Sequence, residues 1–585
     1  MLVFFVNASL SPMARAASSA SSAGKPGAGY ATSRLFAFCL VFRVANAFAV
    51  RTYFNADEFW QGPEVAHRVV FGYGHLTWEW QRGLRGYAHV AIFAGVYKLA
   101  ALLGADTTFV IAWGPRVAQA AIAAVGDVYT HELARRWFRS ASAARYATFC
   151  SLACWFNFFC GVRTFSNCLE AVLTAAALAH WPWGRPGTPG DARASDRKKK
   201  RDEALFPSFA ANRPRAVAFA GAACLIRPTA ATYFLPLFVT ELARTTTKAT
   251  FLCRECLPVA VATIALGVGV DRAFSGETYV AAWNFFKFNV NEGGSAAYGT
   301  HPWHWYLTQG FPAVATVFAP LAALGCVSGT LKGARAWEPF AVAGYCVLGH
   351  SLAAHKEFRF LMPALPPTLA AAGGALAAWQ AEPKTAWRTR RAVALVLLTQ
   401  IPAAAYLSWW HQSGTVAAVR HVAALAAAGE TRAGGVFFAT PCHQHPFHTH
   451  AHLPSRVPVP MSFLECPPAS AEGRGEHEPD EADRFFADPE TFLDHRFGSV
   501  GDDGAPSHVV LFDGTSRDAG MRRWLEKWDF EVQKRLFHAH FAVDRELQAE
   551  VLVFARPEAA RRAEAPPRGS PETTETRREG NEDEL

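Results

Sequence analysis

The sequence predicts an α-helical protein that crosses a membrane many times and ends in a small α/β domain. Of its 585 residues, 51% are hydrophobic and only 18% are charged, whereas soluble domains carry about 25% charged residues. The apolar residues gather in segments close to the roughly 20 residues that cross a hydrocarbon core. Because lipid cannot hydrogen-bond to the backbone, such segments must be helices. A long polar stretch follows the last of them, from residue 411 onward.

Nine apolar segments are each expected to form one spanning helix. They are residues 34–52, 107–130, 144–160, 166–183, 255–272, 305–325, 337–354, 358–380 and 391–410. The apolar stretch 215–241 is interrupted by Arg227-Pro228, and proline breaks or kinks a helix, so we expect two short helices there. The prediction is thus about eleven membrane helices. A full span at the apolar stretch 87–105 would place the later basic loops on the wrong side of the membrane. We therefore expect a juxtamembrane or re-entrant helix there.

Basic residues in the connecting loops set the orientation, because loops rich in Lys and Arg face the cytosol. These residues are Arg135, Arg136, Arg139, Arg145, Arg197 to Arg201, Arg244, Lys248, Arg254, Lys332, Arg335, Lys384, Arg388, Arg390 and Arg391. With a cytosolic N-terminus, the loops 53–106 and 273–304 and the polar C-terminal part are lumenal. The basic residues of the cytosolic loops therefore account for the net charge of +8. The basic residues form no patch interleaved with aromatics, which argues against nucleic-acid binding.

Five segments make up the predicted domain organisation. They are a disordered cytosolic leader (1–33), a membrane domain (34–410) with a cytosolic linker (184–215), a lumenal α/β domain (411–555) and a disordered tail (556–585). A transit peptide is the alternative for the leader, which is rich in Ser and Ala. In the lumenal domain we expect strands at 436–440, 508–512 and 550–554 and a helix at 518–528. The final NEDEL is either a retrieval signal or a chance acidic end.

In this orientation the unusual polar motifs all reach the lumenal surface. Ionisable groups that converge at one membrane surface mark a candidate site. The candidates are Asp57, Glu58, Gln61, Glu64, His67, Trp78, Glu79, Trp80, Arg163, Arg227, His301, His304, His355, Lys356, Glu357 and Arg359.

Asp57 and Glu58 directly follow the first span. A carboxylate there can act as a general base towards an incoming hydroxyl, although any helix exit tolerates carboxylates at the headgroup boundary. Gln61, Glu64 and His67 recur at helical spacing from Asp57, so these groups can share one face. The aromatic rings that follow, up to Trp80, fit either a sugar platform or an interfacial anchor.

Basic residues supply the complementary chemistry. Arg227, Lys356 and Arg359 are suited to holding a phosphate and stabilising it as a leaving group. His301 and His304 flank Pro302-Trp303 and lack a third metal ligand at a standard spacing. We therefore expect the loop 283–306 to grip a lipid-linked substrate.

The segment CHQHPFHTHAH, residues 442–452, is the best metal-site candidate by composition. Its spacing matches no standard zinc motif. In an oxidising lumen, Cys442 and Cys466 can instead form a disulfide. The residues of this segment suit either interpretation.

Four separated blocks resemble one known family. They are NADEFWQGPEVAHRVVFGYGHLTWEW, WNFFKFNVNEGGSAAYGTHPWHWYLTQGFP, AAHKEFRFLMPALP and TPCHQHPFHTHAHLP. Together they resemble the dolichyl-phosphate-mannose-dependent mannosyltransferases of glycosyltransferase family 22. Within that family, they are similar to the branch that adds the third mannose of the glycosylphosphatidylinositol (GPI) anchor. The resemblance extends over roughly residues 35–555.

The resemblance implies a GT-C fold in the endoplasmic reticulum membrane with its active site on lumenal loops. It implies inverting transfer of mannose in α1,2 linkage from dolichyl phosphate mannose to a GPI glycolipid, without a metal or other cofactor. The family's carboxylate motif falls on Asp57, the favoured base, and Glu58, although Ala56 replaces a proline that relatives often have. His355 to Arg359 match the family's HKExRF block, which we assign to donor phosphate or acceptor contacts.

The sequence is compatible with three alternatives to this function. A mannosyltransferase of N-glycan precursor assembly is the alternative within the same chemistry, and the block at 441–468 favours the anchor pathway. A transporter is the non-enzyme alternative, but the ionisable clusters lie at one surface instead of the membrane midplane. A membrane subunit without activity is disfavoured by the intact Asp57-Glu58 pair.

Overall fold

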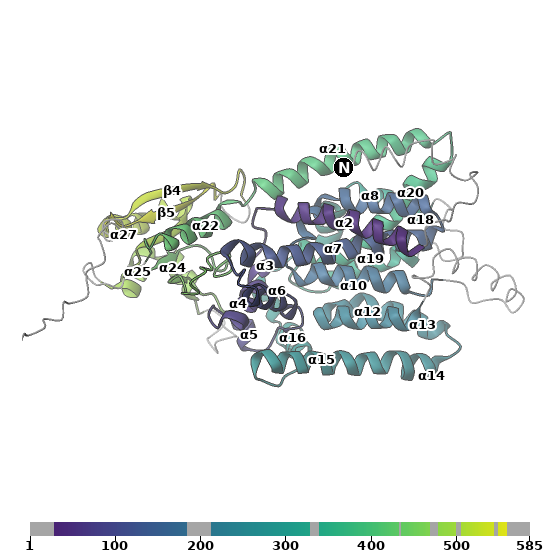
Figure 1. The fold of residues 1–585 in the computed structure, drawn as a ribbon, viewed down its shortest axis with the longest axis horizontal. Coiled ribbons are helices and arrows are strands. Elements are labelled where there is room, and N and C mark those ends of the chain that lie inside the picture. The colour runs from purple at the N-terminus through teal and green to yellow at the C-terminus, as the bar shows by residue number, and fades with distance from the viewer. Residues whose placement is uncertain are drawn as a thin grey trace, which may run out of the picture.

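A bundle of membrane helices with a mixed α/β domain at one end forms the fold (Figure 1). The computed structural model describes residues 28–183, 212–327, 338–431, 434–468, 478–498, 505–542 and 548–557. Most of the predicted leader, cytosolic linker and C-terminal tail, including NEDEL, lies outside these residues.

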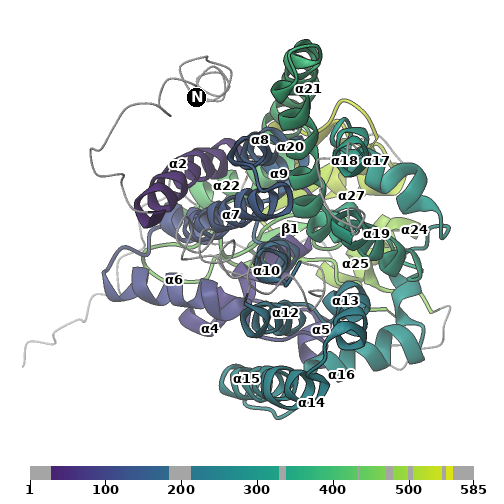
Figure 2. The same ribbon diagram turned by 90° about the vertical axis from the view of Figure 1, so that its right-hand side faces the viewer.

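The bundle helices run side by side along one axis, and α10 lies at their middle when the bundle is seen from its end (Figure 2). They are α2 (Ala28–Ala49), α7 (Thr108–Phe138), α8 (Ala141–Ala153), α10 (Ser166–His180), α12 (Arg213–Ile226), α13 (Ala231–Arg244), α15 (Leu257–Ser275), α18 (Phe318–Val327), α19 (Glu338–Ser351), α20 (Leu365–Ala381) and α21 (Ala386–Trp409). Most residues of α10 are buried, as expected for a helix at the centre of the bundle.

Several of these helices are long and apolar enough to cross a membrane. Among the described residues, length and composition select five: Thr32–Ala49, Thr108–Phe138, Lys248–Ser275, Phe358–Ala381 and Ala386–Ala427. The bent pair Tyr306–Ala315 and Phe318–Val327 makes a sixth if it is one span. The protein is therefore a multi-pass membrane protein. The number eleven stays a prediction, because other expected spans correspond to helices of 13 to 15 residues.

The structure corrects three predicted boundaries. The single helix expected over 305–325 is wrong, because the chain bends by 95° there and Thr316 adopts a positive φ of 46°. The helix expected over 144–160 is interrupted at Cys154, where α9 (Trp155–Cys160) follows α8. Helix α7 continues to Phe138, through residues that we expected in a basic loop.

The predicted break at Arg227-Pro228 is confirmed. Helix α12 ends at Ile226, and Arg227 is extended with a φ of −144°, as expected of a residue before proline. A short 3₁₀ turn, Pro228–Ala230, leads into α13. The side chain of Arg227 is thereby brought to the end of the bundle that faces the α/β domain.

Short helices fill the space between the bundle and the α/β domain (Figure 1). They are α3 (Asp57–Trp60), α4 (Pro63–Phe71), α5 (Trp78–Gln81), α6 (Val90–Leu102) and α16 (Ala281–Phe286). Helix α6 corresponds to the apolar stretch 87–105 and has 13 residues, too few to cross the membrane. It runs across the bundle axis (Figure 2), which agrees with a helix outside the spanning set.

The α/β domain is a five-stranded sheet between two layers of helices. Its strands are β1 (Val436–Phe438), β2 (Met461–Phe463), β3 (His508–Phe512), β4 (Glu531–Phe537) and β5 (Glu550–Ala555), in the order β2-β1-β3-β5-β4. β1 is parallel to β2 and β3, whereas β5 is antiparallel to β3 and β4. One face packs on α22 (Gly414–Ala427). The other packs on α24 (Glu481–Ala487), α25 (Pro489–Phe497) and α27 (Ala519–Lys527).

Three strands and the helix at 518–528 were predicted correctly, as β1, β3, β5 and α27. β4 was missed because it is a largely exposed edge strand with a charged sequence, EVQKRLF. β2, with the sequence MSF, was also missed. The core beneath α22 also contains Tyr53, Phe59 and Trp60. The α/β domain therefore shares its hydrophobic core with the loop that follows α2.

Candidate functional site

Asp57 presents a partly accessible carboxylate at the start of α3. Its side chain is 22% exposed, and its Oδ2 lies 2.5 Å from Nη2 of Arg359. The backbone N–H of Asp57 donates to Oδ1 of Asn55 at 3.0 Å. The structure thus joins the loop that follows α2 to the HKEFRF block, which lies about 300 residues further along the chain.

Arg359 is also held by Glu357. Its Nε donates to Oε2 of Glu357 at 2.6 Å and its Nη2 to Oε1 at 2.5 Å. His355 contacts the same Oε1 through Nε2 at 3.0 Å, and Asn55 Nδ2 donates to Oε2 at 3.1 Å. Burial opposes the ionisation of Glu357, yet Arg359 and His355 hold its pKa below the usual range. Asp57 therefore lies in a fully connected charged network.

Arg227 adds a second guanidinium group to this cluster. The guanidinium carbons of Arg227 and Arg359 both lie 5.3 Å from the centre of the Phe360 ring. Arg227 Nη1 donates to Ser166 Oγ at 3.1 Å, and its Nε lies 3.4 Å from Glu170 Oε2. Two cationic groups therefore lie beside the Phe360 ring, and one of them, Arg359, pairs with the Asp57 carboxylate.

A cleft leads from this cluster along the bundle between α12 and α15. Its polar end is lined by Gln61, Arg85, His89, Ser166, Arg227 and Asp271, and its walls by Leu225, Ile226, Ile264, Val268 and Phe285. Gln61 Nε2 is buried there without a hydrogen-bond partner among the described residues. A cleft with apolar walls and arginines at one end has the chemistry to hold a lipid chain that carries a phosphate.

Glu58 points away from this cleft and is fully buried. Its Oε1 accepts from Arg116 Nη2 and its Oε2 from Arg163 Nη1, both at 2.6 Å. Arg163 also donates to the carbonyl oxygen of Thr52 at 2.8 Å. Arg116 was missed by the sequence analysis, although an arginine within an apolar span is itself a signal. Two adjacent carboxylates thus have different surroundings.

Glu64 and His67 face the α/β domain instead of the cleft. Glu64 Oε1 accepts from the backbone N–H of Phe447 at 2.7 Å and from Thr449 Oγ1 at 2.6 Å. Burial raises the pKa of Glu64 to about 7. His67 Nε2 lies 2.9 Å from Nδ1 of His452, and burial lowers the pKa of His67 to about 3.

The residues of α5 divide between the core and the surface. Trp80 is buried, and its Nε1 donates to the carbonyl oxygen of Trp60 at 3.2 Å. Glu79 accepts from Thr77 Oγ1 at 2.6 Å, and burial raises its pKa. Trp78 is only half-buried and lies beside Phe288 and Tyr298, with ring centres 5.4 and 6.3 Å away. Trp78 is thus the ring of this pair that a sugar can reach.

Three candidates of the loops 283–306 and 355–359 lie apart from Asp57. Lys356 Nζ donates to the carbonyl oxygens of His301 and Ala353, at 3.0 and 2.5 Å. The His301 ring stacks on Trp305 with centres 4.8 Å apart. His304 is exposed, and Thr308 Oγ1 lies 3.5 Å from its Nδ1. These side chains stabilise the loops around the cluster.

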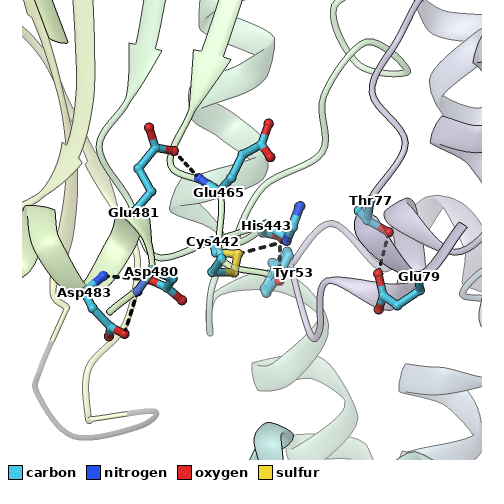
Figure 3. The surroundings of a disulfide bond; sticks show 10 residues. Tyr53, Thr77, Glu79, Cys442, His443, Glu465, Asp480, Glu481 and Asp483 are labelled. Carbon is cyan, nitrogen blue, oxygen red and sulfur yellow. Dashed lines mark hydrogen bonds between the residues drawn. A yellow bond between two sulfur atoms is a disulfide. The ribbon is translucent and has the colours of Figure 1, made fainter. Parts of the chain in front are cut away.

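The histidine-rich segment is closed by a disulfide. Cys442 and Cys466 are bonded, with Cα atoms 6.0 Å apart. Figure 3 shows Cys442 and His443 next to Tyr53. Cys442, His443 and Cys466 lie close enough together to be considered as metal ligands, but both sulfur atoms are used in the bond to each other. The disulfide interpretation of this segment is confirmed.

Comparison with known proteins agrees with this geometry. Residues 34–452 match the Alg9-like mannosyltransferase family. The chain is 37% identical to mannosyltransferase APTG1 of Arabidopsis thaliana over 540 residues, which cover 89% of this chain and 92% of that protein. It is 34% identical to GPI alpha-1,2-mannosyltransferase 3 of Mus musculus over 523 residues, which cover 89% of each chain.

A solved structure supports the fold. ArnT from Cupriavidus metallidurans bound to undecaprenyl phosphate superimposes with a TM-score of 0.53 at 13% identity, over 90% of this chain and 98% of that chain. The GT-C fold implied by the resemblance is thereby confirmed. By sequence, this chain belongs to the Alg9-like mannosyltransferase family, glycosyltransferase family 22.

Proposed function

We propose that the protein transfers mannose in α1,2 linkage from dolichyl phosphate mannose to the GPI glycolipid as its third mannose, in the endoplasmic reticulum lumen. The observation that carries this proposal is the contact between Asp57 and Arg359. Arg359 shares the Phe360 ring with Arg227, which lines the apolar cleft. The GPI step itself rests on the relatives named GPI alpha-1,2-mannosyltransferase 3.

Asp57 is the proposed general base. In the reaction, the 2-hydroxyl oxygen of the acceptor mannose attacks C1 of the donor mannose, and the bond from C1 to the phosphate oxygen breaks with inversion. The hydroxyl proton passes to Asp57, which is partly exposed and therefore accessible to an acceptor. The leaving dolichyl phosphate gains negative charge that Arg227 and Arg359 neutralise.

The cleft between α12 and α15 is the proposed site of the donor lipid. Its walls are aliphatic and aromatic, and Arg85 and Arg227 lie at its polar end. An isoprenoid chain suits the walls, and a phosphate suits the arginines. Bound in this way, the donor presents its mannose towards Asp57.

Glu58 has a structural role in this proposal. It is fully buried, and each of its oxygens accepts a hydrogen bond from a different arginine. An acceptor hydroxyl therefore cannot reach it without breaking the network. We assign the family's carboxylate chemistry to Asp57 alone.

Complementation tests the proposal. Cells that lack the third-mannose step receive the native chain, the Asp57→Asn variant, or the control Glu526→Gln, which changes an exposed carboxylate of α27. Surface GPI anchors are expected to return with the native chain and with the control, but not with Asp57→Asn. Restored anchors with Asp57→Asn would remove Asp57 from the role of base. Rescue of an N-glycan-assembly defect alone would change the proposed acceptor.

A further inference from the structure

Residues 443–452 of the α/β domain, which we call the tail loop, lie directly against α3 and α4. Their contacts follow the order of both segments along the chain. Tyr53 Oη donates to the carbonyl oxygen of His443 at 3.1 Å (Figure 3). Trp60 Nε1 donates to the carbonyl oxygen of His445 at 3.0 Å. These two anchors flank Asp57 in sequence.

The contacts continue along α4. Glu64 receives the backbone N–H of Phe447 and the hydroxyl of Thr449, and His67 pairs with His452. Tyr53, Trp60, Glu64 and His67, which make these contacts, are all buried. The interface is therefore closely packed, and its hydrogen bonds are specific.

Both ends of the tail loop are fastened. At its start, the Cys442–Cys466 disulfide joins it to the segment that follows β2. At its far end, Thr108 Oγ1 donates to the carbonyl oxygen of His452 at 2.5 Å. Arg456, just beyond, pairs with Asp106 at 2.7 Å. The tail loop is thus held to the sheet and to the start of α7.

Helix α3 depends on such support, because it has only four residues and no side-chain cap at its N-terminus. A helix this short is not stable by itself. We propose that the tail loop is a positioning element that fixes α3 and so sets where the Asp57 carboxylate meets the acceptor. This inference rests on the proposed function, and it assigns Tyr53, Trp60, Glu64 and Thr449 as positioning residues.

The expected kinetic signature separates positioning from donor binding. The tail loop contacts α3, which carries the base. None of its residues lines the donor cleft between α12 and α15. Loosening α3 misplaces the base, and small misplacements of a reacting group cost large factors in rate. The kcat should therefore fall while the KM for the donor changes little.

Two conservative variants test the inference in the full-length protein with dolichyl phosphate mannose as donor. Tyr53→Phe removes only the hydroxyl that reaches His443, and Thr449→Val removes only the hydroxyl that reaches Glu64. Tyr146→Phe is the matched control, because its buried hydroxyl has no hydrogen-bond partner among the described residues. We expect kcat to fall about tenfold in each test variant and to stay unchanged in the control.

Amide hydrogen exchange gives a readout that does not depend on activity. Both test variants should exchange faster than the native protein at residues 54–61 and equally at α8 and α20. Unchanged exchange at 54–61, or a raised donor KM with unchanged kcat, would refute the positioning role. If the native protein does not transfer mannose, the proposed function is refuted. Faster exchange at residues 54–61 in the two test variants would then still support the positioning of α3.

Discussion

Replacing Glu58 by Gln and Asp57 by Asn should damage the protein in two different ways, although the residues are neighbours. Glu58→Gln removes a negative charge that lies fully buried between Arg116 and Arg163. Asp57→Asn removes a charge that is partly exposed and pairs with Arg359. The two variants are nearly isosteric, so charge is the variable that changes.

The magnitude follows from the contacts of Glu58. It accepts two charge-assisted hydrogen bonds of 2.6 Å from two arginines. The Gln variant keeps one acceptor oxygen, but its amide N–H₂ group faces the other guanidinium group. Removing one partner of a buried ion pair costs about 3–5 kcal/mol, because it leaves charge uncompensated. We expect a loss of about 4 kcal/mol of stability.

Thermal unfolding of the purified protein in detergent measures this loss. We expect Glu58→Gln to lower the unfolding temperature by about 5 °C or more. Asp57→Asn should unfold like the native protein but transfer mannose about 10²- to 10⁴-fold more slowly, since general-base catalysis contributes that much. Glu526→Gln, an exposed carboxylate on α27, is the control for both measurements.

The opposite pattern would refute this reasoning. A Glu58→Gln variant that is as stable as the native protein yet inactive would show that the buried carboxylate takes part in the chemistry. An Asp57→Asn variant that keeps its activity would show that the accessible one does not.

Three further changes have defined outcomes. Arg359→Lys should reduce kcat/KM at least about 10-fold, because a lysine cannot bridge Asp57 and Glu357 as the planar guanidinium group does. The control Arg517→Lys, which changes an exposed arginine, should have no effect in the same assay. Replacing Cys442 and Cys466 by Ser should cost about 3 kcal/mol of stability, because the disulfide closes a loop with a sequence separation of 24 residues. An unchanged unfolding temperature would contradict this prediction. Stability should fall as the pH drops from about 6.5 to 4. In this window the unfolded chain binds more protons than the folded protein, because burial lowers the pKa of four histidines to about 3 or 4. They are His67, His443, His445 and His448. Each contributes up to about 1.4 kcal/mol per pH unit. Together they outweigh the opposite contributions of Glu64 and Glu79, whose raised pKa values remove stability as the pH rises above about 4.5. Unfolding temperatures measured between pH 5 and 8 check the sign, and a flat profile would contradict it.

Local patterns were sufficient for much of the fold. The apolar runs predicted the long helices α2, α7 and α21, and the Arg227-Pro228 pair predicted the break between α12 and α13. Failures occurred where tertiary packing overrides the local pattern. The bend at Thr316 lies within a continuous apolar run, so hydropathy gives no sign of it.

The candidate site was predicted in part. Loop charge indicated that Asp57 and Arg359 share one surface, and the structure brings them into contact. Spacing along the chain also grouped Glu64 and His67 with Asp57, but these two side chains face the α/β domain. Helical periodicity predicts which residues share a face, and it does not predict what that face meets.

The sequence by itself determined that this is a multi-pass membrane protein of the Alg9-like family with its ionisable motifs at one surface, because hydropathy, loop charge and short motifs are local properties. Only the tertiary structure decided the roles of Asp57 and Glu58. Both arginines that bury Glu58 come from distant parts of the chain, Arg116 from α7 and Arg163 from the turn between α9 and α10, 58 and 105 residues further along. Adjacent residues of one helical turn point in different directions, so the surroundings of each carboxylate are fixed only when those distant segments pack.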